Sequence, residues 1–571
     1  MPTDKSQWTV GHVLARQAAR RAAAPFFQVQ DRPALSYGET DALANRLARG
    51  VIGLGVQPGD RVAVMLPNGA EILLAWFGLC RAGAVSVFVN TAYKGIFLEH
   101  VLNNAGAEAL ILHRDFLPAL AAALPATPRL KRVFVVEGGP TASQRPAPQP
   151  PGPRSGAPSG APSGAPSGAP AGGPLPVLPG VVVAPWEALL DASAAPVDVE
   201  VSYRDTGSIM YTSGTTGPSK GVLMPHAHLY LFGQEEARWL RLTERDVYYI
   251  CMPLFHANAL FMQLYGTLFA GAKAAIVPGF SASRWLDDVR KTGATVTNTL
   301  GVMMEFVFRQ PPRPEDRQHR LRLILAVPGP AEIAQAFMER FNVQLLEAYG
   351  MTEINIPVHG RIDSPFKPGS CGQVNTDWWD VKIVHPETDE DVPPGALGEI
   401  VCRPKEPFAF MAGYNGMPEK TVEAWRNFWF HTGDAGRIDA DGYVYFVDRI
   451  RDTIRRRGEN LSSYEIERVL AEHTAVAEVA AIAVKSSLPG GEDEVKACIV
   501  LREGQRPRPE ALLDWCAQRM PYFAVPRYVE FVAALPKTPT QKIQKNKLRE
   551  QGLTAGTWDR EQAGYQLRRR A

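Results

Sequence analysis

The chain has 571 residues, of which 45% are hydrophobic and 21% charged, and its formal net charge is +2. That length exceeds one compact core and predicts roughly three or four domain-sized units, with the composition of a soluble globular protein. The near-neutral balance gives no polyelectrolyte signature, which argues against nucleic acid as a partner.

The six cysteines are scattered, without a Cys-x-x-Cys pair or a histidine spacing that would hold zinc. They are typical of reduced thiols, so we expect a cytoplasmic protein. A mitochondrial presequence over 14–24 is the alternative. The most apolar span, 254–272, is interrupted by polar residues, and we expect a buried helix there and no transmembrane segment.

Helical and strand patterns alternate from residue 40 to residue 112. The spacing predicts helices over 40–53, 72–80 and 97–104, and strands over 61–66, 85–89 and 109–112. Such alternation implies a parallel sheet covered on both faces. Residues 139–180 then contain four tandem Ser-Gly-Ala-Pro units, whose small apolar surface predicts a disordered insertion on a surface loop.

The stretch 211–222 reads YTSGTTGPSKGV and concentrates hydroxyls, glycines and one lysine between two apolar runs. Glycine lets backbone N–H groups turn toward an anion, and hydroxyls and lysine donate to phosphate oxygens. It is not a Walker A loop, because Lys220 is followed by glycine. A solvated turn is the alternative, but nine special residues in twelve favour a phosphate-binding loop.

The alternation resumes after this loop and then changes character. The patterns predict strands over 247–251, 274–277, 294–300, 323–327 and 343–346, with helices over 283–291 and 332–341. From 372 to 448, short strands and Gly/Pro/Asp turns predict antiparallel hairpins. Past residue 449 a smaller unit is expected, with helices over 463–473 and 509–520 and strands over 476–484 and 494–501.

Six segments in this order resemble the adenylate-forming enzymes, which include acyl-CoA synthetases, peptide-synthetase adenylation domains and beetle luciferases. They are 211–222, 253–256, 349–353, 430–434, 448–467 and 536–548. Among subfamilies the chain is most similar to bacterial crotonobetaine/carnitine–CoA ligases, through 310–312, 318–322, 349–353 and 457–460.

The resemblance implies an α/β fold in which a large N-terminal domain, residues 1–449, holds two wound α/β subdomains and a small β-barrel-like subdomain. A hinge at 450–451 would join it to a small mobile α+β domain, residues 452–571. The implied activity is an ATP-dependent carboxylate–CoA ligase. A carboxylate attacks the α-phosphate of ATP, giving acyl-adenylate and pyrophosphate, and the CoA thiol then displaces AMP.

The implied nucleotide site contains the phosphate loop and several later motif residues. The loop residues are Thr212, Ser213, Gly214, Thr215, Thr216, Gly217 and Lys220. The later residues are Tyr349, Gly350, Met351, Thr352, Asp434, Arg449 and Lys542.

Each of these later residues has an implied role. Glu353 would hold Mg²⁺, Thr352 would contact the α-phosphate, and the ring of Tyr349 would lie against adenine. Asp434 would accept from both ribose hydroxyls, with Arg449 as a donor to the same sugar.

Further roles belong to the acyl pocket and the small domain. Lys542 would reach the reacting oxygens in adenylation. His256, at the mouth of the acyl pocket, would orient the carboxylate rather than act as a base, since a carboxylate is already ionised at neutral pH. The hinge residue would be Arg451, and Gly458 would line the pantetheine tunnel.

The arginine run 455–457 leaves two interpretations open: contact with CoA phosphates, through Arg457 for example, or a solvated face. The chain also departs from the family pattern. Gln541 replaces the usual glycine before Lys542, and Arg451 replaces the usual Asp or Lys at the hinge. Gly329 is the candidate residue for the adenine wall.

Three functions therefore remain in play. The chain ends soon after Lys542, which favours free CoA over a tethered thiol and hence the CoA ligase. The alternatives are a stand-alone ligase that loads a carrier protein and a non-catalytic nucleotide-binding regulator. The acid itself is open: Trp378, Trp379 and Tyr265 could face a trimethylammonium group, while 259–262 suits an aliphatic chain. A homodimer is one option for the oligomeric state.

Overall fold

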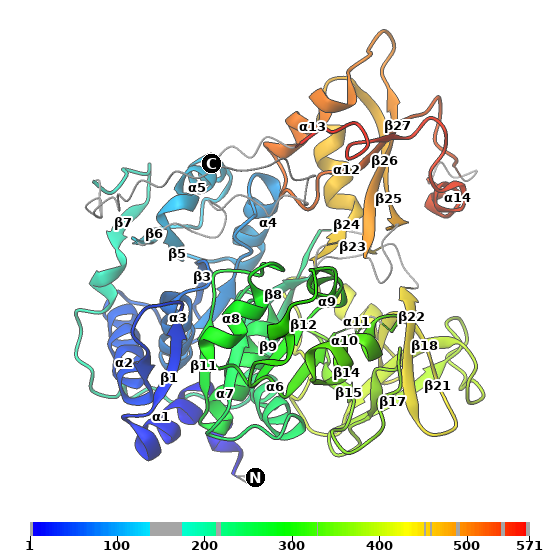
Figure 1. Ribbon diagram of the computed structural model, residues 1–571. Helices are drawn as coiled ribbons and strands as arrows, with labels where there is room; N and C mark the ends of the chain where they lie inside the picture. Colours follow the sequence, from blue (N-terminus) through cyan, green and yellow to red (C-terminus); the bar gives the residue numbers. More distant parts are fainter. Residues whose placement is uncertain are drawn as a thin grey trace, which may run out of the picture.

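The structure is a computed structural model that describes residues 4–137, 174–212, 218–327, 329, 331–449, 453–456, 459–486, 492–537 and 543–566. These residues form a mixed α/β fold with a large N-terminal domain and a smaller C-terminal domain, orange to red at the top of Figure 1. The predicted fold class is confirmed. The proposed hinge and most of the insertion 139–180 lie outside the described residues. Near the end of that insertion, however, Leu178 is buried and pairs with Val181.

The first wound unit is built on a sheet that has eight strands in the described residues, in the order β19-β9-β8-β4-β3-β5-β6-β7. Their bounds are β3 (Arg61–Met65), β4 (Val85–Phe88), β5 (Ala109–His113), β6 (Arg132–Val136), β7 (Val182–Pro185), β8 (Thr206–Thr212), β9 (Lys220–Pro225) and β19 (Gly413–Tyr414). From β8 to β7 the pairing is parallel, as the alternation predicts. β9 and β19 add an antiparallel edge.

The second sheet has fourteen strands in the described part of the chain and combines a parallel and an antiparallel half. The parallel half contains β1 (Pro25–Val29), β10 (Val247–Ile250), β11 (Lys273–Ile276), β12 (Val296–Thr299) and β13 (Leu323–Ala326), with β2 (Leu35–Ser36) antiparallel at its edge. The antiparallel half contains β15 (Asn355–His359), β16 (Gly372–Val374), β17 (Trp379–Val384), β18 (Gly398–Pro404), β20 (Trp425–Arg426), β21 (Trp429–Ile438) and β22 (Tyr443–Arg449). β14 (Gln344–Met351) joins the halves, because it is parallel to β13 and antiparallel to β15.

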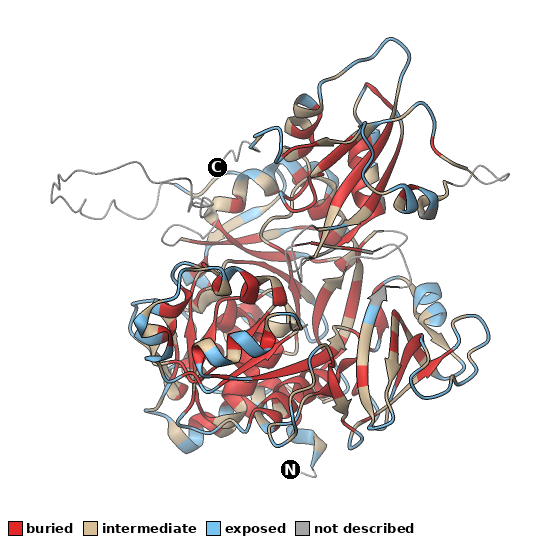
Figure 2. Ribbon diagram, turned by 45° about the vertical axis from the view of Figure 1, so that its right-hand side comes forward, coloured by how far each residue is buried: buried red, intermediate tan, exposed pale blue. Residues whose placement is uncertain are grey.

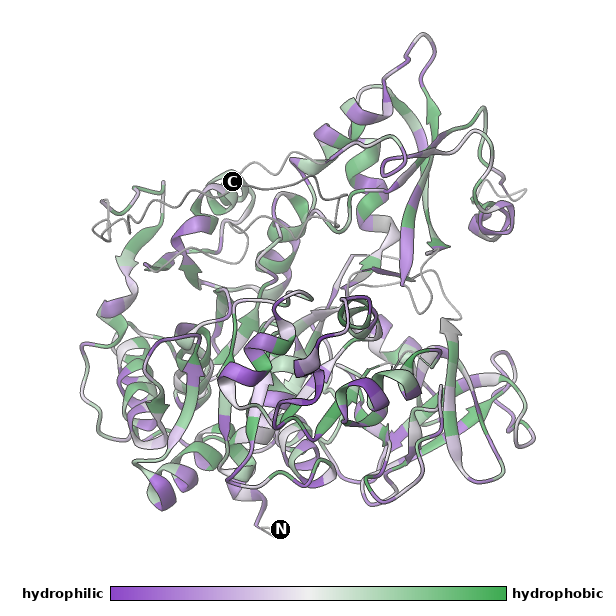
Figure 3. Cartoon of the chain, in the orientation of Figure 1, coloured by the Kyte–Doolittle hydropathy of each residue, from purple (hydrophilic) through white to green (hydrophobic). Residues whose placement is uncertain are grey.

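Helices cover these sheets. In the N-terminal domain they are α1 (Val10–Arg21), α2 (Tyr37–Gly53), α3 (Ala70–Arg81), α4 (Ile96–Ala105), α5 (Leu117–Ala123), α6 (His226–Trp239), α7 (Tyr265–Ala270), α8 (Trp285–Thr292), α9 (Gly301–Phe308), α10 (Ala334–Phe341) and α11 (Pro418–Ala424). Figures 2 and 3 show that the strands and the inner helix faces are mostly buried and hydrophobic, whereas exposed and hydrophilic residues lie mainly on the outside. Ser36 and Glu39 form a capping box at the start of α2, which explains where that helix begins.

The structure of two segments differs from what the sequence predicted. Residues 14–24 are not a free leader-like segment, because α1 buries Val13 and Leu14 in the main core. The helix expected from residue 254 begins later: Leu254 donates its N–H to Asn68 Oδ1, so a π-helix starts at Asn258 and leads into α7. Among the described residues no helix is both long and apolar enough to cross a membrane.

The C-terminal domain pairs β25 (Val476–Lys485), β26 (Asp493–Leu501), β27 (Tyr528–Phe531) and β28 (Trp558–Asp559) in one sheet, and β23 (Thr453–Arg456) with β24 (Glu459–Ser462) in another. Its helices are α12 (Ser463–Ala471), α13 (Pro509–Ala517) and α14 (Lys545–Gln551). One face of the β25–β26 pair packs on α12 and α13, and the other on Leu548 of α14 and on Ile543.

The two domains touch in the described residues. Phe97 of α4 belongs to the same buried cluster as Ile466 and Leu513 of the C-terminal domain. In Figure 1, α4 accordingly lies beside the base of the small domain. This contact fixes one particular arrangement of the domains.

Candidate functional site

The expected phosphate loop connects two antiparallel strands. Thr212 ends β8, Lys220 begins β9, and the two stand opposite each other in the strand register. Residues 213–217 lie outside the described residues, so the positions of Ser213, Gly214, Thr215, Thr216 and Gly217 stay predictions.

Glu353 lies directly beside the base of that loop. Its Oε1 accepts hydrogen bonds from Thr212 Oγ1 at 3.3 Å and from Tyr414 Oη at 3.0 Å. Lys220 Nζ lies 4.0 Å from the ring centre of Tyr414, which is cation–π distance. Side chains from three parts of the chain that are distant in sequence, namely the base of the loop, Glu353 and Tyr414, therefore meet at one point, and Glu353 is only 3% exposed there.

The turn that carries Thr352 and Glu353 is held from below by His228. The ring nitrogens of this buried histidine lie 2.8 Å from the carbonyl oxygen of Thr352 and 2.6 Å from that of Ala409. Burial lowers the pKa of His228 to about 4, although the two carbonyl oxygens favour the protonated ring. Gly350 precedes this turn in β14 beside Met351, and a Cβ at Gly350 would lie 2.2 Å from the carbonyl oxygen of Asn355.

Tyr349 and Asp434 form a second buried pair. Tyr349 Oη donates to Asp434 Oδ2 at 2.7 Å, and the two residues are 6% and 1% exposed. Burial, reinforced by the charge of Asp434, raises the pKa of Tyr349 well above its usual value, so the phenol keeps its proton. Arg449 stands opposite Asp434 in the β21–β22 register.

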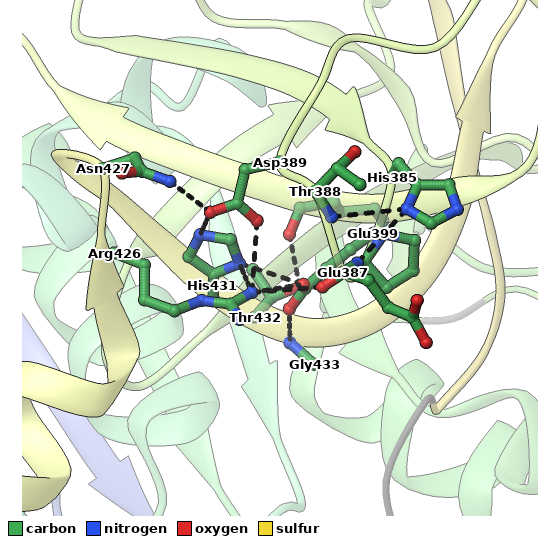
Figure 4. A network of polar contacts seen from close by, with 12 residues as sticks. His385, Glu387, Thr388, Asp389, Glu399, Arg426, Asn427, His431, Thr432 and Gly433 are labelled. Atoms are coloured by element: carbon green, nitrogen blue, oxygen red, sulfur yellow. Dashed lines mark hydrogen bonds and ion pairs between the residues drawn. The ribbon is translucent and has the colours of Figure 1, made fainter.

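A polar network supports the turn before Asp434 (Figure 4). Glu399 accepts from the backbone N–H of Gly433 at 2.9 Å, and Gly433 has a φ of +70°, which glycine adopts without strain. His431 lies between Glu399, at 2.9 Å, and Arg426, at 2.8 Å. This network fixes the turn and thereby the direction of the Asp434 carboxylate.

His256 contacts the C-terminal domain. Its Nε2 lies 3.0 Å from Oε1 of Glu459, which also accepts from Asn90 Nδ2 at 3.0 Å. Burial lowers the pKa of His256, but the charge and hydrogen bond of Glu459 outweigh it, and the net pKa is raised. Sequence reasoning placed His256 at the mouth of the acyl pocket and did not identify this partner.

A second polar contact crosses the domains close to the phosphate loop. The backbone N–H of Ser219 donates to Glu465 Oε1 of α12 at 2.9 Å, while His100 Nε2 lies 2.7 Å from the Ser219 carbonyl oxygen. Glu465 is 6% exposed, and burial raises its pKa to about 7. The small domain is therefore docked against the loop that we expect to bind phosphate.

Several predicted residues cannot be placed. Lys542, Arg451, Arg457 and Gly458 lie outside the described residues, as does the Arg449 side chain. Ile543, next to Lys542, packs on the face of the β25–β26 pair opposite to the one that meets Phe97.

Both interpretations of the arginine run fail for Arg456. Its side chain is 2% exposed, donates to the carbonyl oxygens of Phe523 and Val525 and pairs with Glu494. It is thus neither solvated nor free to meet CoA phosphates, because it fills a buried acidic niche of the C-terminal domain. The adenine-wall guess, Gly329, lies against the carboxylate of Glu347, which would be 2.6 Å from a Cβ at that position.

Sequence reasoning missed the residues that connect the motifs: Asn90, His228, Tyr414, Glu459 and Glu465. None stands inside a pattern that indicates chemistry by itself. Glu459 and Glu465 do follow Gly458 within the segment 448–467, and this position inside a motif is the signal that could have identified them. The described residues contain no group of three or more His, Cys, Asp or Glu side chains suited to a metal.

Comparisons with known proteins identify the family of the chain. The model of the AMP-binding enzyme family matches residues 14–414, and that of the AMP-binding enzyme C-terminal domain matches residues 465–542. A crotonobetaine/carnitine–CoA ligase of Proteus mirabilis is 30% identical over 528 residues, covering 90% of this chain and 92% of that protein.

Solved structures show the same architecture. ATP-bound MatB from Rhodopseudomonas palustris is 26% identical with a TM-score of 0.64, covering 95% of this chain and 99% of that one. The o-succinylbenzoate CoA synthetase of Bacillus subtilis, bound to a product analogue, is 23% identical with a TM-score of 0.75, covering 94% and 98%. The chain therefore belongs to the AMP-binding enzyme family and is an adenylate-forming acyl-CoA ligase.

Proposed function

We propose that the cluster around Glu353 is where this ligase binds the triphosphate of ATP. Thr212, the loop residues 213–217 and Lys220 would hold the β- and γ-phosphates, with Thr352 at the α-phosphate. The observation that carries this proposal is the meeting of Thr212, Glu353 and Tyr414 within 3.3 Å at the end of β8. No simpler structural role requires a buried carboxylate beside a loop so rich in donors.

The residues present also fit a magnesium ion. Mg²⁺ is usually bound through one or two carboxylates together with substrate phosphates rather than by a complete protein cage. Glu353 supplies one such carboxylate, so it would be the protein ligand. When bound, the ion would neutralise charge on the phosphates.

We assign the nucleoside to the second buried pair. Asp434 would accept from the ribose hydroxyls, Arg449 would donate to the same sugar, and the Tyr349 ring would lie against adenine. The Tyr349–Asp434 hydrogen bond supports this assignment, because it presents ring and carboxylate as one rigid unit. Gly350 and Met351 would contribute backbone at the same place.

The docked arrangement supports a role in thioester formation. Glu459 contacts His256, and Gly458 and Arg457 immediately precede it in the sequence, where CoA would enter. Ile543 packs away from the N-terminal domain, so we assign Lys542 to adenylation in a second arrangement. Rotation about Arg451 would interchange the two.

For the acid, we propose a substrate whose tail is polar or cationic. The aromatic candidates do not form a cage: Tyr265 packs against Trp76, Trp378 against Trp8, and Trp379 against Trp239. Tyr265 and Trp379 belong to the hydrophobic core, and the partly buried Trp378 packs against it.

A buried polar cluster lies instead just beyond His256. Asn258 Oδ1 accepts from Asn298 at 2.9 Å and Gln263 at 3.0 Å, and Asn298 in turn donates to Glu236 at 3.0 Å. Glu236 is fully buried, and its Oε2 has no hydrogen-bond partner among the described residues. Burial raises the pKa of Glu236 to about 7, so an incoming cation or hydrogen-bond donor would stabilise the charged form. The name of the Proteus mirabilis relative agrees with a betaine acid.

The proposal is tested by CoA-dependent AMP release with butyrate, octanoate, benzoate and crotonobetaine, with acyl-CoA detected by mass spectrometry. We expect the highest kcat/KM for crotonobetaine, and a loss of about 10- to 100-fold for that acid in Glu236→Gln. A preference for octanoate that Glu236→Gln leaves unchanged would contradict the substrate assignment. Silence with all four acids, in pyrophosphate release as well, would contradict the site assignment.

Two further proposals concern cellular location and oligomeric state. The six cysteines are buried and unpaired as disulfides, which suits the proposed cytoplasmic location. A homodimer stays a prediction that light scattering would check.

A further inference from the structure

His256, Glu459 and Asn90 form a cluster whose capacity for proton transfer adenylation does not use. His256 follows the β10 end of the N-terminal domain, Asn90 follows β4 of the same domain, and Glu459 begins β24 of the small domain. The His256 side chain is 37% exposed and that of Glu459 15% exposed, so the imidazole has an open side and the carboxylate is largely enclosed.

The hydrogen bonds determine which imidazole nitrogen is available. Asn90 Oδ1 accepts from the backbone N–H of Ala92 at 2.9 Å, so its amide nitrogen faces Glu459. Glu459 Oε1 is then a carboxylate acceptor for both neighbours. His256 Nε2 therefore carries the proton, and in the neutral ring the lone pair is on Nδ1.

We propose that His256 is the general base of thioester formation, that its Nδ1 takes the proton of the CoA thiol, and that Glu459 is the positioning residue that orients the ring. This inference rests on the proposed function of the site. In the step, the S–H bond breaks and its proton goes to Nδ1. The sulfur forms a bond to the acyl carbon, and the bond from that carbon to the phosphate oxygen breaks, releasing AMP with its electron pair.

Physical chemistry favours this role. An ordinary thiol has a pKa of about 8.5, so only a few per cent is thiolate at pH 7. A neutral imidazole with a partner carboxylate suits a proton transfer near neutral pH. The charge of Glu459 raises the pKa of His256 against the effect of burial, which makes the ring a stronger base.

The location of Glu459 makes the proposed base depend on domain docking. Because the carboxylate comes from the small domain, the cluster is complete only when the domains are docked as in this structure. The other charged group acting on His256 is Arg455, which lowers its pKa and which pairs with Glu492. The base would thus be assembled together with the route by which the thiol arrives.

The test separates the two half-reactions. Rapid-quench single turnovers would use the isolated adenylate of the best acid in the panel above, with CoA, from pH 5.5 to 9. We expect His256→Asn to lose about 10²- to 10⁴-fold at pH 7. Its remaining rate should follow the thiolate fraction, rising about tenfold per pH unit up to about 8.5.

Glu459→Gln keeps a hydrogen-bonding side chain but removes the charge, so the rising limb of its profile should move to lower pH with about a tenfold loss in rate. Added imidazole should restore part of the rate of His256→Ala. The matched control is Glu465→Gln, which removes the titratable group from another cross-domain contact, Ser219 to Glu465, without touching His256. Docking should weaken when Glu465 ionises. The effect of Glu465 on the rate is therefore a fall as pH rises, opposite to the rise that His256 produces.

Three outcomes would overturn the inference: a wild-type pH profile in His256→Asn, equal losses in adenylation and thioester formation, or a Glu465→Gln profile that matches Glu459→Gln. An NMR titration of His256 needs no substrate and covers the case in which the proposed function itself fails. We expect a pKa above 6.5 in the wild type and a lower one in Glu459→Gln; equal values would contradict the role of Glu459.

Discussion

The nucleotide pair and the domain contact are built in different ways. Tyr349 and Asp434 come from two strands of one sheet and are 6% and 1% exposed. His256 and Glu459 come from two domains, and their side chains are 37% and 15% exposed. The first pair is therefore set by the fold itself, whereas the second exists only while the domains are docked. If the first pair binds ATP and the second acts in thiol transfer, as we propose, the two steps depend on separate free energies and can be altered separately.

The largest expected effect comes from Lys542→Ala. Removing the cation that we assign to the reacting oxygens should lower adenylation by about 10³-fold, while thioester formation from supplied acyl-AMP stays largely intact. Pyrophosphate release and single-turnover thioester formation measure the two steps. The exposed Lys547→Ala serves as control; equal losses in both half-reactions would sink the account of two domain arrangements.

Arg456→Leu should lower the stability of the C-terminal domain and leave ATP binding to the N-terminal domain unchanged. The substitution leaves Glu494, a largely buried carboxylate, with only its longer ion pair to Arg527 at 3.8 Å, which costs about 3 kcal/mol in the free energy of unfolding of the C-terminal domain. Differential scanning calorimetry should show that transition at lower temperature, with ATP binding to the N-terminal domain retained. Arg455→Ala, at a partly exposed pair with Glu492, should cost less than about 1 kcal/mol. A selective rise in the KM for CoA, without destabilisation, would contradict the structural role of Arg456.

Tyr349→Phe tests the preorganised pair. The phenol donates to a buried carboxylate, and its removal should weaken ATP binding by about 1–2 kcal/mol, or roughly 5- to 30-fold in Kd. Isothermal titration with ATP measures this change. Tyr445→Phe, whose phenol donates to Asp439 at 3.2 Å, removes a comparable hydrogen bond elsewhere in the same sheet and should leave the Kd unchanged. Similar losses in both variants would argue against a specific nucleotide role.

The smallest effect is a pH dependence of docking. Burial raises the pKa of Glu465 from its ordinary 4.5 to about 7, against the opposing charge of Arg468. A group whose pKa is raised in the docked state holds its proton there more tightly, so docking should weaken as pH rises from about 4.5 through about 7. Small-angle scattering should show a few-fold smaller docked population at pH 8 than at pH 6. Glu465→Gln should remove this slope, and docking that strengthened with pH would contradict the assignment.

The sequence predicted the framework because its signals are local. Helix 40–53 carries an apolar stripe and the capping residues Ser36 and Glu39, and α2 forms there. The short Val-rich strands of the first unit also appear where the pattern places them. The start of the 254–272 helix was wrong, because a side chain distant in sequence, Asn68, bonds the N–H of Leu254. A periodic pattern contains no information about such a partner.

The same limit applies to the site. Order and spacing of motifs indicated Lys220, Glu353, Tyr349 and Asp434. In the structure Tyr349 contacts Asp434 directly, whereas Lys220 and Glu353 each contact Tyr414. The sequence could not show that Tyr414 contacts both Lys220 and Glu353, because its strand β19 pairs with β9 from almost two hundred residues away. Arg456 illustrates the opposite error, since a run of charge looks identical in sequence whether it is solvated or buried against Glu494.

The most direct test of the central claim is the fate of the carboxylate oxygens. The enzyme would be incubated with ATP, CoA and an ¹⁸O-labelled acid of the panel, and the AMP would be analysed by mass spectrometry. An acyl-adenylate route transfers one ¹⁸O atom from the carboxylate to AMP, with acyl-CoA formed in equal amount. Unlabelled AMP, or ADP and phosphate as products, would contradict it.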